Sequence, residues 1–327
     1  MSSYRDRYIA RGIPPFDPSS CAPYPVGQVP QAGWYLIEPA GTYTIPTYFK
    51  GRQLNVAFAA EAKKRLHIPV CVVGNITTLE EAEEIIASGK ADIVELARQS
   101  ICDPYFPEKA FSGHADDITR CCRCVTCFYN YLTNRTFCCA FNPVVGHELE
   151  SFSAPPATTP KKVVVVGGGP GGMEAAIVAA QRGHSVTLYE KSGRLGGQLC
   201  SEQYIPFKQD MYNFVKVLEG RLQKAGVDVR LNTALTPEQA EALGADVVIV
   251  AVGAQPIVPP IPGVDGKNVV GLEALHQPEP ALGQKVVILG GGLVGTECAI
   301  YLDGLGKDVT VQEMKDDWAA DAYFMHR

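Results

Sequence analysis

An internal repeat of thirty residues is the feature that most constrains the fold. "KVVVVGGGPGGMEAAIVAAQRGHSVTLYEK" begins at Lys162, and "KVVILGGGLVGTECAIYLDGLGKDVTVQEM" begins at Lys285, so the copies are 123 positions apart. Each copy joins an apolar stretch, a GxGxxG motif, a helical pattern and a second apolar stretch. Two copies of one unit in register are far less expected by chance than a single motif. The repeat predicts two nucleotide-binding βαβ units in an α/β fold.

Both glycine motifs have the context that a dinucleotide-binding loop needs, because each follows a strand pattern and opens a helix. The first glycine allows a tight turn, the second lets the backbone approach a pyrophosphate, and the third lets the helix pack against the strand. Pyrophosphate would then bind at the helix N-terminus. The glycines are Gly167, Gly169 and Gly172 in the first copy, and Gly290, Gly292 and Gly295 in the second.

An acidic residue ends the second strand of each copy, eighteen positions after the third glycine: Glu190 and Glu313. A carboxylate there can accept hydrogen bonds from a ribose 2′-hydroxyl and would repel a 2′-phosphate. The second copy is therefore expected to prefer NADH to NADPH. The alternative is that these glutamates simply end their strands.

The second constraint is a cluster of cysteines, since six of the chain's eleven fall between positions 121 and 139. The first thirty residues lack the apolar stretch of a signal peptide, so a cytoplasmic location with reduced thiols is expected. The spacing C-x2-C-x2-C-x11-C favours a [4Fe–4S] cluster over a structural zinc site or no metal. The expected ligands are Cys121, Cys124, Cys127 and Cys139, with Cys122 and Cys138 as spare neighbours.

Before the cysteines, strand patterns alternate with helical patterns. "WYLIEPA", "PVCVVGN" and "ADIVELAR" each suit a buried strand, and "RQLNVAFAAEAKKRL" and "TLEEAEEIIASG" suit helices. This alternation predicts parallel strand pairing. Residues 1–32 show no periodicity and are expected to be irregular. "SFSAPPATTP", residues 151–160, is the clearest linker.

The residues after Glu190 carry a first resemblance. "GRLGGQ" follows it, and "AVG" ends at Gly253, so the chain resembles the two-dinucleotide-domain flavoprotein reductases. That resemblance implies NADH at Gly290, Gly292, Gly295 and Glu313. It also implies FAD at Gly167, Gly169, Gly172, Glu190, Arg194, Gly197, Gln198 and Gly253.

The order of the parts, with "CAFNP" closing the cysteine segment, resembles the long iron–sulfur branch of the old yellow enzyme family. The resemblance implies the C-terminal part of an FMN-binding TIM barrel, with the FMN phosphate at Gly74, Asn75 and Arg98. The implied domains are a barrel portion over 33–118, a [4Fe–4S] segment over 119–150, an FAD-binding domain over 161–278 and an NAD(P)H-binding domain over 279–327. The family's usual motif, C-x2-C-x3-C-x11-C, has a third gap one residue longer, so the third ligand and the choice of Cys121 over Cys122 stay open.

A whole barrel has eight strands, and few strand patterns precede the cysteines. An incomplete reading frame, a fragment, is therefore expected, and no catalytic acid can be named. Tyr35, Tyr43, His114 and His147 are expected to be packing or surface residues.

The function that the resemblance implies is electron transfer from NADH through FAD, the cluster and FMN to an activated C=C bond of a small-molecule substrate. The alternatives are amine oxidation of the trimethylamine dehydrogenase type, or an inactive remnant that binds FAD and cluster. A net charge of −6 and the lack of long apolar runs argue against nucleic-acid and membrane partners. A homo-oligomer is possible.

Overall fold

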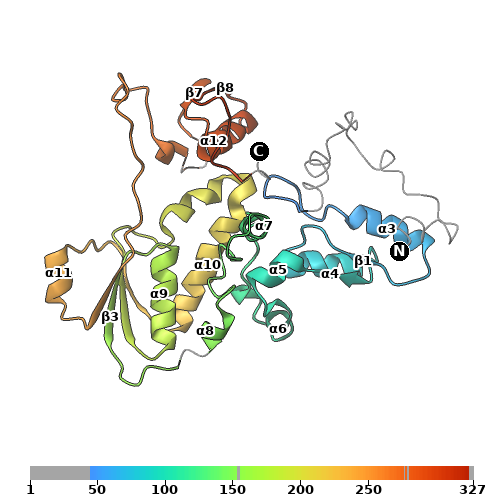
Figure 1. Cartoon of the computed structure of the whole chain (residues 1–327), viewed down its shortest axis with the longest axis horizontal. Helices are drawn as coiled ribbons and strands as arrows, with labels where there is room; N and C mark the ends of the chain where they lie inside the picture. The colour runs from blue at the N-terminus through green and yellow to red at the C-terminus, as the bar shows by residue number, and fades with distance from the viewer. Residues whose placement is uncertain (1–44, 153–154, 276, 278–279, 324–327) are drawn as a thin grey trace. The chain divides into compact units, whose positions relative to one another are not determined.

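The computed structural model describes residues 45–152, 155–275, 277 and 280–323 (Figure 1). The irregular stretch expected over residues 1–32, the strand expected in "WYLIEPA", and Tyr35 and Tyr43 lie outside the described residues.

The first described segment alternates helices and parallel strands as expected. β1 pairs with β2 in parallel, with Cys71 opposite Ile93. The helix between them begins with a capping box, because Thr78 accepts a hydrogen bond from the Glu81 backbone and the Glu81 side chain bonds back to Thr78. The elements are α3 (Val56–Arg65), β1 (Cys71–Val72), α4 (Leu79–Ala87), β2 (Ile93–Val94), α5 (Ala97–Cys102), α6 (Phe106–Phe111) and η2 (Ala115–Asp117).

The expectation that these strands are fully buried is wrong. Val72 is buried in a small core with Ile85 of α4, but Cys71 is exposed and Ile93 is 52 % exposed. A strand sends successive side chains to opposite faces, and the described helices cover only one face of this pair. An apolar run therefore does not by itself show that both faces are covered.

Two short helices, α7 (Thr126–Leu132) and α8 (Glu148–Phe152), belong to the cysteine segment. The second runs two residues into the stretch expected to be linker. Beyond it, the Ala157 backbone N–H bonds to the Arg182 carbonyl, so the linker follows the surface of the next unit.

The first copy of the repeat lies in a four-stranded parallel sheet with the order β5-β4-β3-β6. Helices α9 and α10 lie side by side against it, and Leu188, Met173 and Leu218 are fully buried between these elements (Figure 1). The elements are β3 (Lys162–Val166), α9 (Pro170–Gln181), β4 (Ser185–Tyr189), η3 (Gly197–Tyr204), η4 (Pro206–Lys208), α10 (Gln209–Lys224), β5 (Asp228–Arg230), α11 (Pro237–Ala242) and β6 (Val247–Val250).

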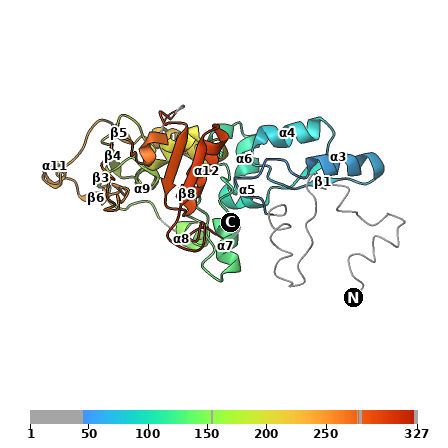
Figure 2. The same ribbon diagram turned by 90° about the horizontal axis from the view of Figure 1, so that it is seen from above.

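The second copy repeats the first with its element bounds shifted by 123 positions: β7 (Lys285–Leu289), α12 (Leu293–Gly304) and β8 (Asp308–Gln312), preceded by η5 (Leu272–Leu275). Helix α12 packs on the β7–β8 pair (Figure 2). The copies differ in burial, because Val164 of β3 is 1 % exposed and its counterpart Val287 of β7 is 59 % exposed. Among the described strands, β7 pairs only with β8, so one edge and one face of it stay open.

None of the described helices is long and apolar enough to cross a membrane.

Replacement of Leu218 by alanine tests the packing of α10. Leu218 is 0 % exposed, so the cavity should lower the free energy of unfolding by about 2–5 kcal/mol. Val178→Ala, on a side chain of α9 that is 44 % exposed, should change it by less than about 0.5 kcal/mol. Urea denaturation followed by circular dichroism measures both, and equal effects would contradict this account of the core.

Candidate functional site

In the first glycine loop, residues 167–172, the first and third glycines of the motif are required sterically, and the middle one is not. Gly167 has φ +111°, and a Cβ there would stand 2.2 Å from the Ala251 carbonyl oxygen. A Cβ on Gly172 would stand 1.9 Å from the Gly167 carbonyl oxygen, so only glycine lets α9 approach the strand this closely. A Cβ on Gly169, the N-cap of α9, would meet no atom within 4 Å. The middle glycine therefore faces open space at the helix N-terminus.

Three segments far apart in the sequence meet at this loop. The Gly196 backbone N–H donates to the Gly168 carbonyl at 2.8 Å, and a Cβ on Gly197 would lie 3.1 Å from the Gly169 Cα. Gln198 Nε2 donates to the Ala254 carbonyl at 2.9 Å, which ties "GRLGGQ" to the end of β6. The structure therefore brings the first glycine loop, Gly197, Gln198 and the segment of Gly253 together, while Arg194 is exposed on the same turn. Their binding of FAD stays a prediction.

Glu190 lies directly after β4 and is 8 % exposed. Its Oε2 accepts from the Gly168 backbone N–H at 2.7 Å, and its Oε1 accepts from the Ser192 backbone N–H at 2.8 Å. Burial acts to raise the pKa of this carboxyl, but the hydrogen bonds outweigh it and the pKa is lowered. The carboxylate is thus ionised and fixed against the glycine loop.

The second glycine loop has the same backbone. A Cβ on Gly295 would stand 1.9 Å from the Gly290 carbonyl oxygen, and Glu313 Oε2 accepts from the Gly291 backbone N–H at 2.7 Å. Hydrogen bonds from the Lys315 and Gly291 backbone lower the pKa of Glu313. Both strand-end glutamates therefore do more than end a strand, since each holds its own glycine loop.

The loops differ at the helix N-terminus. Asp321 Oδ1 accepts from the Leu293 backbone N–H at 2.8 Å, and a Cβ on Gly292 would meet this carboxylate at 3.1 Å. Trp318 packs on the Gly291 backbone, so a Cβ at Gly291 would lie 2.6 Å from its indole ring. A carboxylate therefore occupies the helix N-terminus at which the sequence predicts a pyrophosphate. Sequence reasoning missed this contact, and its only signal was the acidic stretch after Glu313.

All four expected cluster ligands line one small cavity of about 20 Å³. Two further thiols share it, those of Cys102 and Cys122, whereas Cys138 accepts a hydrogen bond from Asn130 outside it. Sequence reasoning missed Cys102, which the spacing rule could not find because it lies nineteen positions before Cys121.

The sulfur donors around this cavity suit a group that binds thiols, while the pKa values of the four expected ligands divide into two pairs. A hydrogen bond from Cys122 lowers the pKa of Cys124 to about 6, and one from Cys102 lowers the pKa of Cys139 to about 7. Burial raises the pKa of Cys121 to about 12 and also raises that of Cys127.

Within residues 45–152, 155–275, 277 and 280–323, no three His, Cys, Asp or Glu side chains converge as they would around a single metal ion. A tetrahedral zinc ion needs all four sulfurs about 2.3 Å from one point.

The expected FMN-phosphate residues follow β1 and β2 at one edge of the pair. Gly74 has φ +146° and Asn75 has φ +60°, and Asn75 Nδ2 donates to the Gly51 carbonyl at 2.6 Å. Arg98, in α5, donates to the Pro46 carbonyl at 2.7 Å and also lines the cysteine cavity. Its charge opposes the effect of burial on the pKa of Cys121. The structure thus places Arg98 beside the cysteines, and phosphate binding by this set stays a prediction.

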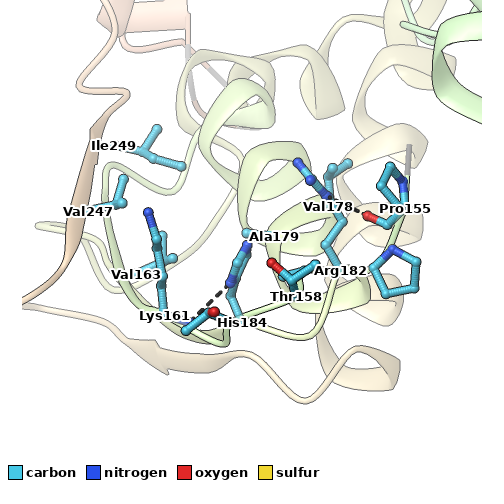
Figure 3. A pocket seen from close by; sticks show the side chains of 13 residues that line it. Pro155, Thr158, Lys161, Val163, Val178, Ala179, Arg182, His184, Val247 and Ile249 are labelled. Atoms are coloured by element: carbon cyan, nitrogen blue, oxygen red, sulfur yellow. Dashed lines mark hydrogen bonds between the residues drawn. The ribbon is translucent and has the colours of Figure 1, made fainter. Parts of the chain in front are cut away.

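A second cavity lies at the end of the four-stranded sheet where β3 and β6 begin. Figure 3 shows the linker, the starts of β3 and β6 and the end of α9 around it, with the His184 ring accepting from the Lys161 backbone N–H at 3.2 Å. The glycine loop follows the other end of β3, so this cavity is not part of the candidate site. His114 and His147 are exposed, as expected.

Comparisons with known proteins agree on one class of protein, the oxidoreductases. Residues 161–323 match the family model described as "Pyridine nucleotide-disulphide oxidoreductase". An NADH oxidase of Thermoanaerobacter brockii is 41 % identical over 303 residues, which are 89 % of this chain and 46 % of that protein. A cinnamate reductase of Clostridium sporogenes is 39 % identical over 285 residues, or 87 % of this chain and 41 % of the relative.

The solved structure of a 2-naphthoyl-CoA reductase in complex with 2-naphthoyl-CoA has a TM-score of 0.80 at 34 % identity, covering 85 % of this chain and 43 % of that one. The chain spans less than half the length of these relatives.

Gly172→Ala tests the first glycine loop. Its Cβ would collide with the Gly167 carbonyl, so the loop must move, and FAD bound per purified chain should fall about tenfold. Gly171→Ala is the matched control, because a Cβ there meets nothing within 4 Å. Flavin absorbance after gel filtration gives the ratio, and similar loss in both variants would refute the steric reading.

Asp321→Asn tests the second loop. Removing the negative charge from the N-terminus of α12 should tighten NADH binding about three- to tenfold, since a pyrophosphate no longer competes with a carboxylate. Asp303→Asn removes the same charge near the other end of this helix and should leave the affinity unchanged. Fluorescence titration with NADH measures both, and unchanged or weaker binding by the first variant would count against the competition.

Proposed function

The chain belongs to the family of old yellow enzyme-type flavoproteins fused to a dinucleotide-binding domain, and on that premise we propose that it is an NADH-dependent flavin and iron–sulfur oxidoreductase. Electrons would pass from NADH to FAD, through a [4Fe–4S] cluster to FMN, and on to an activated C=C bond. We assign residues 33–118 to a TIM-barrel portion and residues 119–150 to the cluster segment.

The observation that carries the proposal is the cavity lined by six cysteines in a chain that also holds two nucleotide loops. Flavins, when bound, exchange two electrons with NADH or substrate, and a cluster exchanges one electron at a time, so the three groups together form a relay. Thiols alone would support a zinc site equally well. The adjoining nucleotide units favour redox use.

The chain's own residues would bind and orient these groups. The backbone at the N-terminus of α9 would hold the FAD pyrophosphate, and Glu190 would accept from the ribose once its bond to the Gly168 N–H is exchanged. Gln198, tied to the end of β6, would keep the "GRLGGQ" turn against the flavin. Glu313 would take the NADH ribose in the same way.

The cysteine cavity would bind the cluster through Cys121, Cys124, Cys127 and Cys139. Arg98 lies on the same cavity, and its positive charge favours thiolates and an anionic group over neutral thiols. Gly74, Asn75 and Arg98 would hold the FMN phosphate, because backbone N–H groups and a guanidinium suit phosphate oxygens. Arg98 would then stand between two anionic groups.

The substrate class follows from the relatives. A cinnamate reductase and a 2-naphthoyl-CoA reductase share one feature in their names, an unsaturated carboxylate or thioester conjugated with an aromatic ring. We therefore propose an enoate- or acyl-CoA-type acceptor with a conjugated double bond.

Anaerobic purification of the chain tests the proposal. We expect flavin absorption, about four irons and four sulfides per chain, and bleaching of the flavin by NADH. Gly295→Ala should abolish bleaching by NADH while FAD and bleaching by dithionite persist, because its Cβ clashes only with the second loop. Gly304→Ala, with no atom within 4 Å of its Cβ, is the control. A colourless protein that holds zinc would refute the relay.

A further inference from the structure

One buried carboxylate, that of Asp210 in the first turn of α10, holds two arginines from other parts of the chain. It is 5 % exposed. Its Oδ2 lies 3.0 Å from Arg123 Nη2, and its Oδ1 lies 2.5 Å from Arg52 Nη2. Neither nucleotide site uses this residue, and sequence reasoning gave it no role.

Arg123 belongs to the cysteine loop, between Cys122 and Cys124. Its backbone is left-handed, with φ +61°, and Val125 two residues later has φ +52°. Residues other than glycine rarely adopt this backbone conformation, so surrounding contacts must maintain it. This turn places four thiols on one cavity, those of Cys121, Cys122, Cys124 and Cys127.

The Arg123 side chain is the contact that can hold the turn from outside. It is 6 % exposed, and its two terminal nitrogens are both bonded, Nη1 to the Lys50 carbonyl at 2.9 Å and Nη2 to Asp210. A planar guanidinium bonded at two points cannot rotate freely, so it fixes the backbone that carries it.

The charges around Asp210 are not symmetrical. Arg52 has a second carboxylate partner, Glu81, at 3.2 Å. In the part of the chain that the structure describes, Arg123 pairs with no carboxylate other than Asp210. Neutralising Asp210 would therefore leave Arg52 paired but Arg123 buried without a counter-ion, which a buried charge does not tolerate. The effect of neutralising Asp210 should therefore fall on the cysteine loop.

We propose that Asp210 is a positioning residue for the cysteine loop, whose carboxylate locks Arg123 and so keeps the thiols of this loop directed into the cavity. The inference rests on the proposed cluster site, because the cluster is the group that needs these sulfurs in place. It adds a residue eighty-three positions beyond Cys127 to the machinery of the cluster.

The test compares Asp210→Asn with three other variants. Asp210→Glu keeps the charge and should restore most of the wild-type behaviour. Asp228→Asn is the control, since Asp228 of β5 also pairs with an arginine, Arg230 Nη2 at 2.9 Å, but has no bond to the cysteine segment. Arg123→Lys keeps the positive charge but lacks the planar guanidinium that bonds at two points. It replaces Asp210→Asn in the test if circular dichroism and bound FAD show that Asp210→Asn does not fold.

The first measurement is the rate at which a chelator removes iron from the anaerobic protein. We expect Asp210→Asn to lose iron at least about fivefold faster than wild type and to change the electron paramagnetic resonance signal of the reduced cluster. Asp228→Asn should match wild type in both. Equal rates and equal spectra for wild type and Asp210→Asn would overturn the proposal.

The second measurement separates the loop from the cluster. In cluster-free protein, mass spectrometry follows how fast iodoacetamide modifies Cys124 and Cys127 at one pH. Asp210→Asn should speed this at least about fivefold, because the freed loop exposes its thiols. If wild type binds no iron but this acceleration is seen, the proposed function fails and the positioning role stands. Unchanged alkylation in both Asp210→Asn and Arg123→Lys overturns the role.

Discussion

The ion pairs at the start of α10 join parts of the chain that share no secondary structure. Asp210 binds Arg123 of the cysteine loop and Arg52 of the first αβ segment. Two residues earlier, Lys208 Nζ lies 2.5 Å from Glu297 Oε2 of α12, and Tyr48 donates to the other oxygen of Glu297. Separating such a pair would leave an uncompensated buried charge, so the pairs oppose displacement of these segments from one another. An electron relay needs such fixed distances between its groups.

The repeat is the part of the fold that the sequence specifies most completely. The bounds of β7, α12 and β8 repeat those of β3, α9 and β4 at the predicted offset. The reason is largely local, because the positive φ of the first glycine and the contact of the third glycine with the first carbonyl both lie within the motif. The capping box at Thr78 and the parallel pairing of β1 with β2 are predictable on the same local grounds.

What could not be predicted depends on contacts between distant residues. Cys102 reaches the cysteine cavity from the end of α5, and Arg98 lines it from the same helix, yet neither belongs to a spaced motif. The burial of strands was misjudged for a related reason. Ile93 and Val287 lie in apolar runs like that of Val164, but whether a second layer covers a strand is a property of the assembled fold.

The two glycine loops share one backbone conformation but differ in what lies at the N-terminus of the following helix. Both have the same φ pattern, the same contact of the third glycine with the first, and a glutamate bonded to the loop. Their difference comes from residues outside the repeat. The first loop is enclosed by "GRLGGQ" and the end of β6, and leaves Gly169 open, while the second is closed at Gly292 by Asp321. The first loop therefore offers its helix N-terminus directly, whereas a ligand at the second must displace a carboxylate. This asymmetry would suit the proposed function, in which the first loop holds FAD tightly and NADH binds at the second loop and leaves in each cycle.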